Sequence, residues 1–115
     1  MLAYLMPLFL LLLSNTAMTF AWYGHLKAPH WPLWMAVLIS WGIAFFEYWL
    51  AVPANRMGIK VYSLVELKAI QEAISIGVFI LVSIFFFNQS VTWMQALGFG
   101  LIICGAFLVF RGVSV

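Results

Sequence analysis

Four long apolar runs separated by short polar loops constrain the fold of this chain more than any other feature. The runs cover residues 2–23, 33–52, 64–87 and 93–110, and each has about the 20 residues that an α-helix needs to cross a bilayer. Hydrocarbon offers no water to the backbone, so such a run satisfies its N–H and C=O groups within a helix. The pattern predicts an all-α integral membrane protein, with one four-helix transmembrane domain over residues 1–115.

Composition supports this class and argues against others. Of the 115 residues, 67% are hydrophobic and 7% are charged, against roughly 45–50% and about 25% in globular domains. The formal net charge of +2 is too small to indicate a nucleic-acid partner. Cys104 is the only cysteine, so no intramolecular disulfide is expected. The first run has no lysine or arginine before it, which disfavours a signal peptide.

Glu47 is the residue that least fits its surroundings, because it lies within the second apolar run. A charged side chain at membrane depth costs at least ~2.5–3.5 kcal/mol, so it usually faces a partner or a watery cavity. Pro53 disfavours helical geometry at Val52 and is predicted to end the second helix there. Glu47 is then roughly 9 Å inside the helix end, at about 1.5 Å per residue. It is a candidate functional residue.

Glu72 repeats this anomaly in the third helix. Ser63 and Glu66 have the spacing of a capping box, which marks the start of that helix. If the second and third helices are antiparallel, Glu72 reaches a depth comparable with that of Glu47. We therefore expect the two carboxylates to form one coupled site that binds substrate or protons, since like charges so close favour holding one proton between them.

A structural alternative is an ion pair within the membrane. Arg56 follows the second apolar run, and Lys68 lies in the first turns of the third helix. Either cation could neutralise Glu47, and Lys68 could also be shared with Glu72. In that case the glutamates would hold helices together and would have no part in transport.

Polar and aromatic residues in the first helix provide further candidates for substrate binding. Asn15, Thr19 and Trp22 recur at helical spacing and can share one face. Together with Tyr48 they could line a polar cavity. Asn and Thr side chains also join membrane helices by hydrogen bonds. The sequence favours neither role, contact between helices or contact with a ligand, over the other.

We expect neither a metal ion nor a cofactor. His25 and His30 lie in the first loop without a further Cys, Asp or His nearby, which favours solvated histidines over a zinc site. The sequence also has no nucleophile and base at a recognisable spacing, so an enzyme is not expected.

The fourth helix carries small residues at four-residue intervals: Ala96, Gly100 and Cys104. Small side chains let membrane helices approach closely. Four helices also make a thin bundle. These features predict a homodimer in which the fourth helix contributes to the contact.

The charges of the loops predict the orientation in the membrane. The termini and the second loop share one side of a four-helix protein, and Lys27 lies on the other. The positive-inside rule therefore places both termini in the cytoplasm, with the protein in the inner cell membrane. The cations on the cytoplasmic side are Arg56, Lys60, Lys68 and Arg111.

Three blocks carry a resemblance to a known family: SNTAMTFAWYGHLK, ISWGIAFFEYWLAVPANRMG and YSLVELKAIQEAISI. They resemble the recurring blocks of a family of small four-helix membrane proteins in the drug/metabolite transporter superfamily. The segment FFFNQSVTWMQALGFGLIICGAFLVF is similar to the last hairpin of that superfamily, which includes the small multidrug resistance transporters. That branch implies a homodimer exchanging protons for cationic or guanidinium-like compounds.

The chain departs from the small multidrug resistance pattern at the coupling residue. That branch has a glutamate in the middle of the first helix, where this sequence has Ser14, Asn15 and Thr16. The resemblance therefore implies the fold but not the coupling chemistry. Two functions remain: a dimeric transporter of a small cationic or polar solute, in which a desolvated carboxylate alternates between proton and substrate, and a non-transporting structural or accessory membrane protein.

Overall fold

The structure, a computed structural model, describes residues 1–112 and is helical almost throughout. All four α-helices are long and apolar enough to cross a membrane, which agrees with the predicted all-α, multi-pass membrane fold. A short 3₁₀ helix, η1, follows the first of them. The elements are α1 (Leu2–Tyr23), η1 (Gly24–Lys27), α2 (Leu33–Gly58), α3 (Leu64–Phe85) and α4 (Trp93–Arg111).

The second helix is longer than the sequence predicted. It does not end at Val52 but continues through Pro53 to Gly58. Proline removes one backbone hydrogen bond and clashes with the preceding turn. Membrane helices tolerate this because neighbouring helices and local adjustments satisfy the freed groups. The prediction of the helix end was wrong because it weighed the local effect of proline alone.

The third helix ends slightly earlier than predicted, at Phe85 and not at Phe87. The chain turns at Asn88, which has a left-handed φ of 56°. The N–H of Gln89 donates to the Ser83 carbonyl at 3.0 Å, six residues back. This hydrogen bond and the left-handed residue before it form the turn that follows α3.

Both later helices begin with a capping box. At α3 the Ser63 N–H donates to Glu66 Oε1 at 2.8 Å and the Glu66 N–H donates to Ser63 Oγ at 3.1 Å, as predicted. At α4, Thr92 and Gln95 form the same reciprocal pair, which was not predicted. These hydrogen bonds satisfy backbone donors that a helix start leaves without an intrahelical partner.

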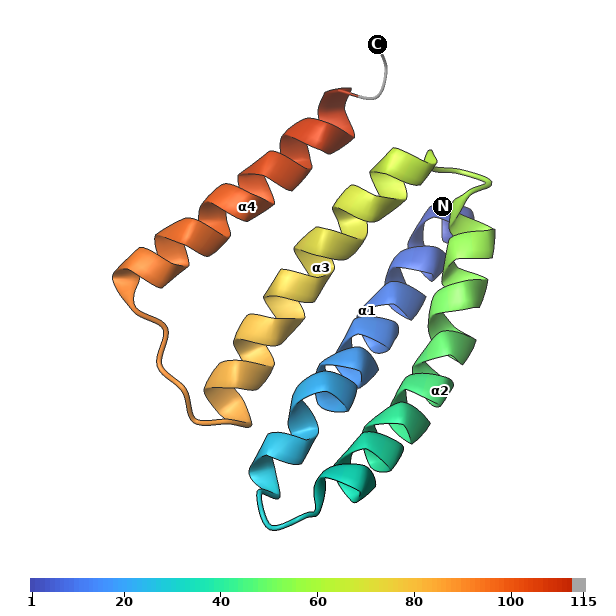
Figure 1. The fold of residues 1–115 in the computed structure, drawn as a ribbon. Coiled ribbons are helices and arrows are strands. Elements are labelled where there is room, and N and C mark those ends of the chain that lie inside the picture. Colours follow the sequence, from blue (N-terminus) through green and yellow to red (C-terminus); the bar gives the residue numbers. More distant parts are fainter. Residues whose placement is uncertain (113–115) are drawn as a thin grey trace.

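Helix α1 is the centre of the bundle. It packs against α2 and also against α3, while α4 contacts α3 (Figure 1). The bundle measures 51 × 35 × 20 Å, so its smallest dimension is about two helix diameters. Its most buried residues come from the first three helices, whereas no residue of α4 is buried. The exposed side chains of the helices are mostly large and apolar, as contact with lipid requires.

Close packing near the second loop fixes the relative position of these three helices. Gly58, the last residue of α2, is buried. A Cβ added to it would lie 2.6 Å from Leu67 Cδ2 of α3 and 3.5 Å from Pro7 Cβ of α1. The absence of a side chain therefore lets the end of α2 approach both other helices.

Candidate functional site

The buried carboxyl group of Glu47 lies between α1 and α2. Only 4% of the residue is exposed. Ser14 Oγ of α1 donates a hydrogen bond to Glu47 Oε1 at 2.5 Å. The other oxygen, Oε2, is buried and has no hydrogen-bond partner within residues 1–112. The site therefore combines one oxygen that is positioned by a hydroxyl with one that has no partner among the described residues.

Because α2 continues beyond Pro53, this carboxyl lies farther from the helix end than predicted. At about 1.5 Å per residue, Glu47 lies about 17 Å from Gly58 and about 21 Å from Leu33. Ser14 likewise lies near the middle of α1, about 18 Å from Leu2 by the same rise. Both residues therefore lie well inside helices that are long enough to cross a hydrocarbon layer about 30 Å thick.

Glu72 has different surroundings. Its carboxylate pairs with Lys68 Nζ at 2.9 Å on the same helix, and the side chains are 48% and 70% exposed. Both residues line a pocket between α3 and α4. Glu47 has neither Lys68 nor Arg56 as a partner in the part of the chain described. The structure thus does not bring the two glutamates into one coupled site, because α1 separates α2 from α3.

The polar face predicted in the first helix is present and lines a pocket. Asn15, Thr19 and Trp22 all contribute to a cavity of about 320 Å³. Asn15 Nδ2 donates to the Leu11 carbonyl at 2.8 Å, and Thr19 Oγ1 donates to the Asn15 carbonyl at 2.7 Å. These two donors are therefore used within α1. The pocket is completed by Met18, Tyr23, Gln71, Ser75, Ile76, Phe79 and Phe99.

Tyr48 lies on the other side of α1. It is exposed, and with Trp22 it lines a second pocket, of about 250 Å³, between α1 and α2. Ala44 lines the same pocket one helical turn before Tyr48. The predicted substrate-binding residues are thus split: Asn15 faces α3, Tyr48 belongs to the α1–α2 side, and Trp22 contributes to both pockets.

The contribution of Ser14 was not predicted from the sequence. There, Ser14 stood out only as part of the segment that replaces a family glutamate. Serine is common in membrane helices, so its presence alone predicts no contact. A signal was nevertheless available, since Ser14 and Glu47 are both polar residues inside apolar runs and the first two helices are antiparallel neighbours.

The space beside the glycines of α4 is not filled by other parts of the described chain. A Cβ added to Gly98, Gly100 or Gly105 would meet no atom within 4 Å in the described structure. Cys104 is exposed. The small residues therefore do not serve to pack α4 against α3.

Among residues 1–112, no group of three or more His, Cys, Asp or Glu side chains is placed to hold a metal ion. The arrangement instead offers one buried carboxyl, one hydroxyl donor and pockets on two sides of α1. These pockets are large enough to receive a small solute.

A family model described as "Putative member of DMT superfamily (DUF486)" matches residues 7–110. The match covers most or all of each membrane helix and includes both Ser14 and Glu47. No curated protein and no solved structure matches the chain.

Proposed function

Because the chain belongs to the DUF486 family of the drug/metabolite transporter superfamily, we propose that it is a small transporter coupling the movement of a small cationic or polar solute to a proton. Membership of this family supports transport in general. The solute, the coupling and the assembly of the protein are proposed from the site.

The buried Glu47 carboxyl is the observation that carries this proposal. A carboxyl at mid-membrane depth is costly unless it is paired or functional. Its Oε1 is held by Ser14, while Oε2 has no partner in residues 1–112. A purely structural role would favour satisfying both oxygens. A proton carrier instead requires an oxygen that remains available.

The solute is proposed to bind beside α1. Asn15 and Trp22 line the pocket towards α3, while Tyr48 and Trp22 line the one towards α2. Met18 belongs to both pockets and lies one helical turn after Ser14. Solute binding on α1 could therefore change the contact between Ser14 and Glu47 by a small movement of that helix.

The functional unit is proposed to be a homodimer with α4 in the interface. No residue of α4 is buried, and Gly100 has open space beside it. Ala96, Gly100 and Cys104 would let the α4 helices of two copies approach closely. The thin bundle would gain a second layer of helices, and pockets at its surface would become enclosed.

Both termini are proposed to lie in the cytoplasm, with the protein in the inner cell membrane. The second loop and the adjoining helix ends carry Arg56, Lys60 and Lys68, against Lys27 on the opposite side. Reporters fused after the last residue should be active only in the cytoplasm. Activity confined to the other side would reverse the orientation.

The alternative of a non-transporting structural protein has partial support. The Lys68–Glu72 ion pair neutralises one glutamate, as that alternative requires. It does not explain Glu47, which has no cationic partner in residues 1–112. Transport therefore accounts for more of the polar residues within the bundle.

The test uses purified protein in liposomes that contain a pH-sensitive dye. Four solutes are applied as gradients: urea, guanidinium, phenylurea and phenylguanidinium, which vary charge and an aromatic ring independently. At least one should move protons with wild-type protein, and Glu47→Gln should abolish the movement while the protein still folds. If none of the four moves protons, the structural alternative becomes the better explanation.

A further inference from the structure

Three adjoining pockets surround Phe79 on the side of α1 that faces α3 and α4. Phe79 lines all three, which have volumes of about 190, 500 and 320 Å³. Thr19 and Tyr23 are shared by the first and third, while Ser83 and Gln89 are shared by the first and second. We call this continuous surface the Phe79 groove. It is large enough for a small organic solute.

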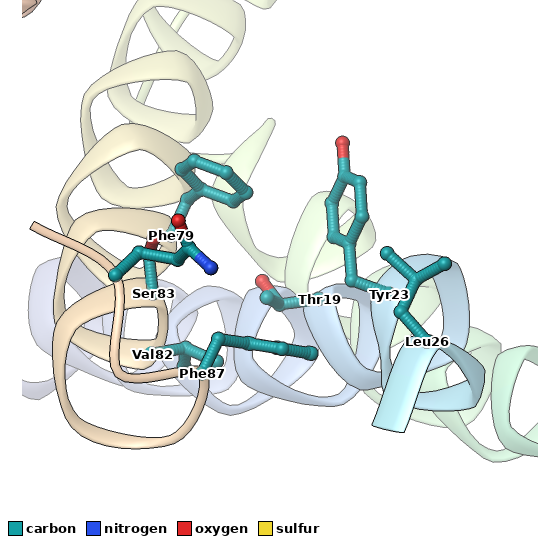
Figure 2. Close-up of a pocket in the computed structure, with 8 residues that line it drawn as sticks. Thr19, Tyr23, Leu26, Phe79, Val82, Ser83 and Phe87 are labelled. Atoms are coloured by element: carbon teal, nitrogen blue, oxygen red, sulfur yellow. The ribbon is translucent and has the colours of Figure 1, made fainter. Parts of the chain in front are cut away.

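The groove lies towards the first and third loops. Figure 2 shows Thr19, Tyr23 and Leu26 on one wall and Phe79, Ser83 and Phe87 on the other. The loop from α3 to α4 contributes Gln89, and α4 contributes Gln95 and Phe99. Figure 1 places this loop at the same end of the bundle as η1, opposite the second loop.

The lining combines aromatic rings with neutral polar groups. Tyr23 and Phe79 meet edge to face, with ring centroids 5.3 Å apart. Aromatic rings gain from further offset or edge contacts, which favours a solute containing a ring. Polar side chains in membrane helices usually face a cavity or the protein interior, so this lining is unlike a surface made for lipid. The neutral polar residues are Asn15, Thr19, Gln71, Ser75, Ser83, Gln89, Ser90 and Gln95.

Charge distinguishes the groove from a site for cations. No Asp, Glu, Lys or Arg lines any of its three pockets. Both Glu47 and Glu72 have their contacts elsewhere. A cation leaving water for such a groove would lose its hydration without gaining a carboxylate partner.

A positive charge also lies near one end of the groove. Lys27 Nζ is 4.7 Å from the centroid of the Phe86 ring. Phe86 in turn meets Phe87, a lining residue, with centroids 5.1 Å apart. The ammonium group is therefore held close to the groove and repels cations that approach it.

We propose that the Phe79 groove is the solute-binding site, and that its ligand is an uncharged molecule with an aromatic ring and a planar hydrogen-bonding group. This assignment rests on the proposed transport function and narrows its solute from cationic or polar to uncharged. Hydroxyl and amide groups orient the polar end, while Tyr23, Phe79 and Phe87 contact the ring.

The test measures protection of an introduced cysteine from maleimide, with Cys104→Ser as the background. Ser83→Cys places the thiol in the groove, and Ser40→Cys places it in the pocket between α1 and α2 as a matched control. Both proteins are studied in lipid nanodiscs at pH 7. Gln89→Cys provides a second, exposed reporter if Ser83→Cys fails to fold or to react.

Phenylurea should slow labelling in the groove by about tenfold more than phenylguanidinium at equal concentration, because the latter would be an unpaired cation there. Urea, which lacks the ring, should give little protection, and Ser40→Cys should be unaffected by all solutes. Lys27→Gln should increase protection by phenylguanidinium.

Equal or better protection by phenylguanidinium would overturn the assignment of an uncharged ligand. Protection by neither compound would overturn the site itself. Equal protection of Ser40→Cys would do so too, because the ligand would then not distinguish the groove from the pocket between α1 and α2. The assay needs no gradient. Protection without coupled flux would thus refute the proposed transport alone, whereas coupled flux without protection would refute this inference alone.

Discussion

The α1–α2 and α3–α4 halves of the molecule each contain a glutamate, but the two differ in burial and in partner. Between α1 and α2, Glu47 is buried and bonds to a hydroxyl on the neighbouring helix. Between α3 and α4, Glu72 is half exposed and pairs with Lys68 on its own helix. The comparison shows that an acidic residue in an apolar run has no fixed role. Its burial and its partner decide whether it is a candidate for chemistry.

The largest expected difference between the halves concerns proton coupling. Glu47→Gln retains the size of the side chain and its ability to accept from Ser14, yet it cannot release a proton. Coupled proton movement into liposomes should fall to the background of empty vesicles. Glu72→Gln is the matched control and should change the rate by less than about twofold, since exposed ion pairs contribute little. The reverse pattern would move the site to the α3–α4 half.

The next effect concerns association through α4. Gly100→Leu introduces a large side chain into the open small-residue face and should weaken dimer formation by about tenfold. Gly42 on α2 also has open space beside it, so Gly42→Leu is the control. Native mass measurement in mild detergent reports both. A wild-type protein that is entirely monomeric there would remove the basis for the proposed dimer.

A smaller effect is expected for the hydrogen bond between α1 and α2. Ser14→Ala should lower the free energy of unfolding by roughly 0.6 kcal/mol, the average for hydrogen bonds between membrane helices, and by no more than about 1.7 kcal/mol, the largest value found. A double-mutant cycle with Glu47→Gln isolates the pair. Thr16→Ala is the control, because Thr16 Oγ1 donates only to the Leu12 carbonyl of its own helix. A zero coupling energy would contradict the contact.

The smallest effect is expected at the ion pair of the other half. Lys68→Met should change the free energy of unfolding by no more than about 0.5 kcal/mol, the usual worth of an exposed pair four residues apart on a helix. Unfolding in a denaturing detergent measures it. A loss several times larger would show that Glu72 is buried in the assembled protein, which would weaken the contrast with Glu47.

Much of the fold could be predicted because bilayer thickness and backbone hydrogen bonding act on each segment separately. The helix starts at Leu33, Leu64 and Trp93 agree with prediction, and the capping box at Ser63 is confirmed. The end of α2 was wrong because the helix continues through Pro53 despite that residue's local preference. The site was predicted less well. Glu47 was identified from its cost in lipid, but its partner Ser14 was not.

The sequence by itself determined the membrane class, the number of spans and the presence of a carboxyl at membrane depth, because each depends on the apolar length or composition of one segment. Only the tertiary structure decided which groups meet. It placed Glu47 against Ser14 and kept it apart from Glu72, whose pairing with Lys68 is local to α3. Both results follow from α1 lying between α2 and α3, an arrangement set by packing between helices far apart in the sequence.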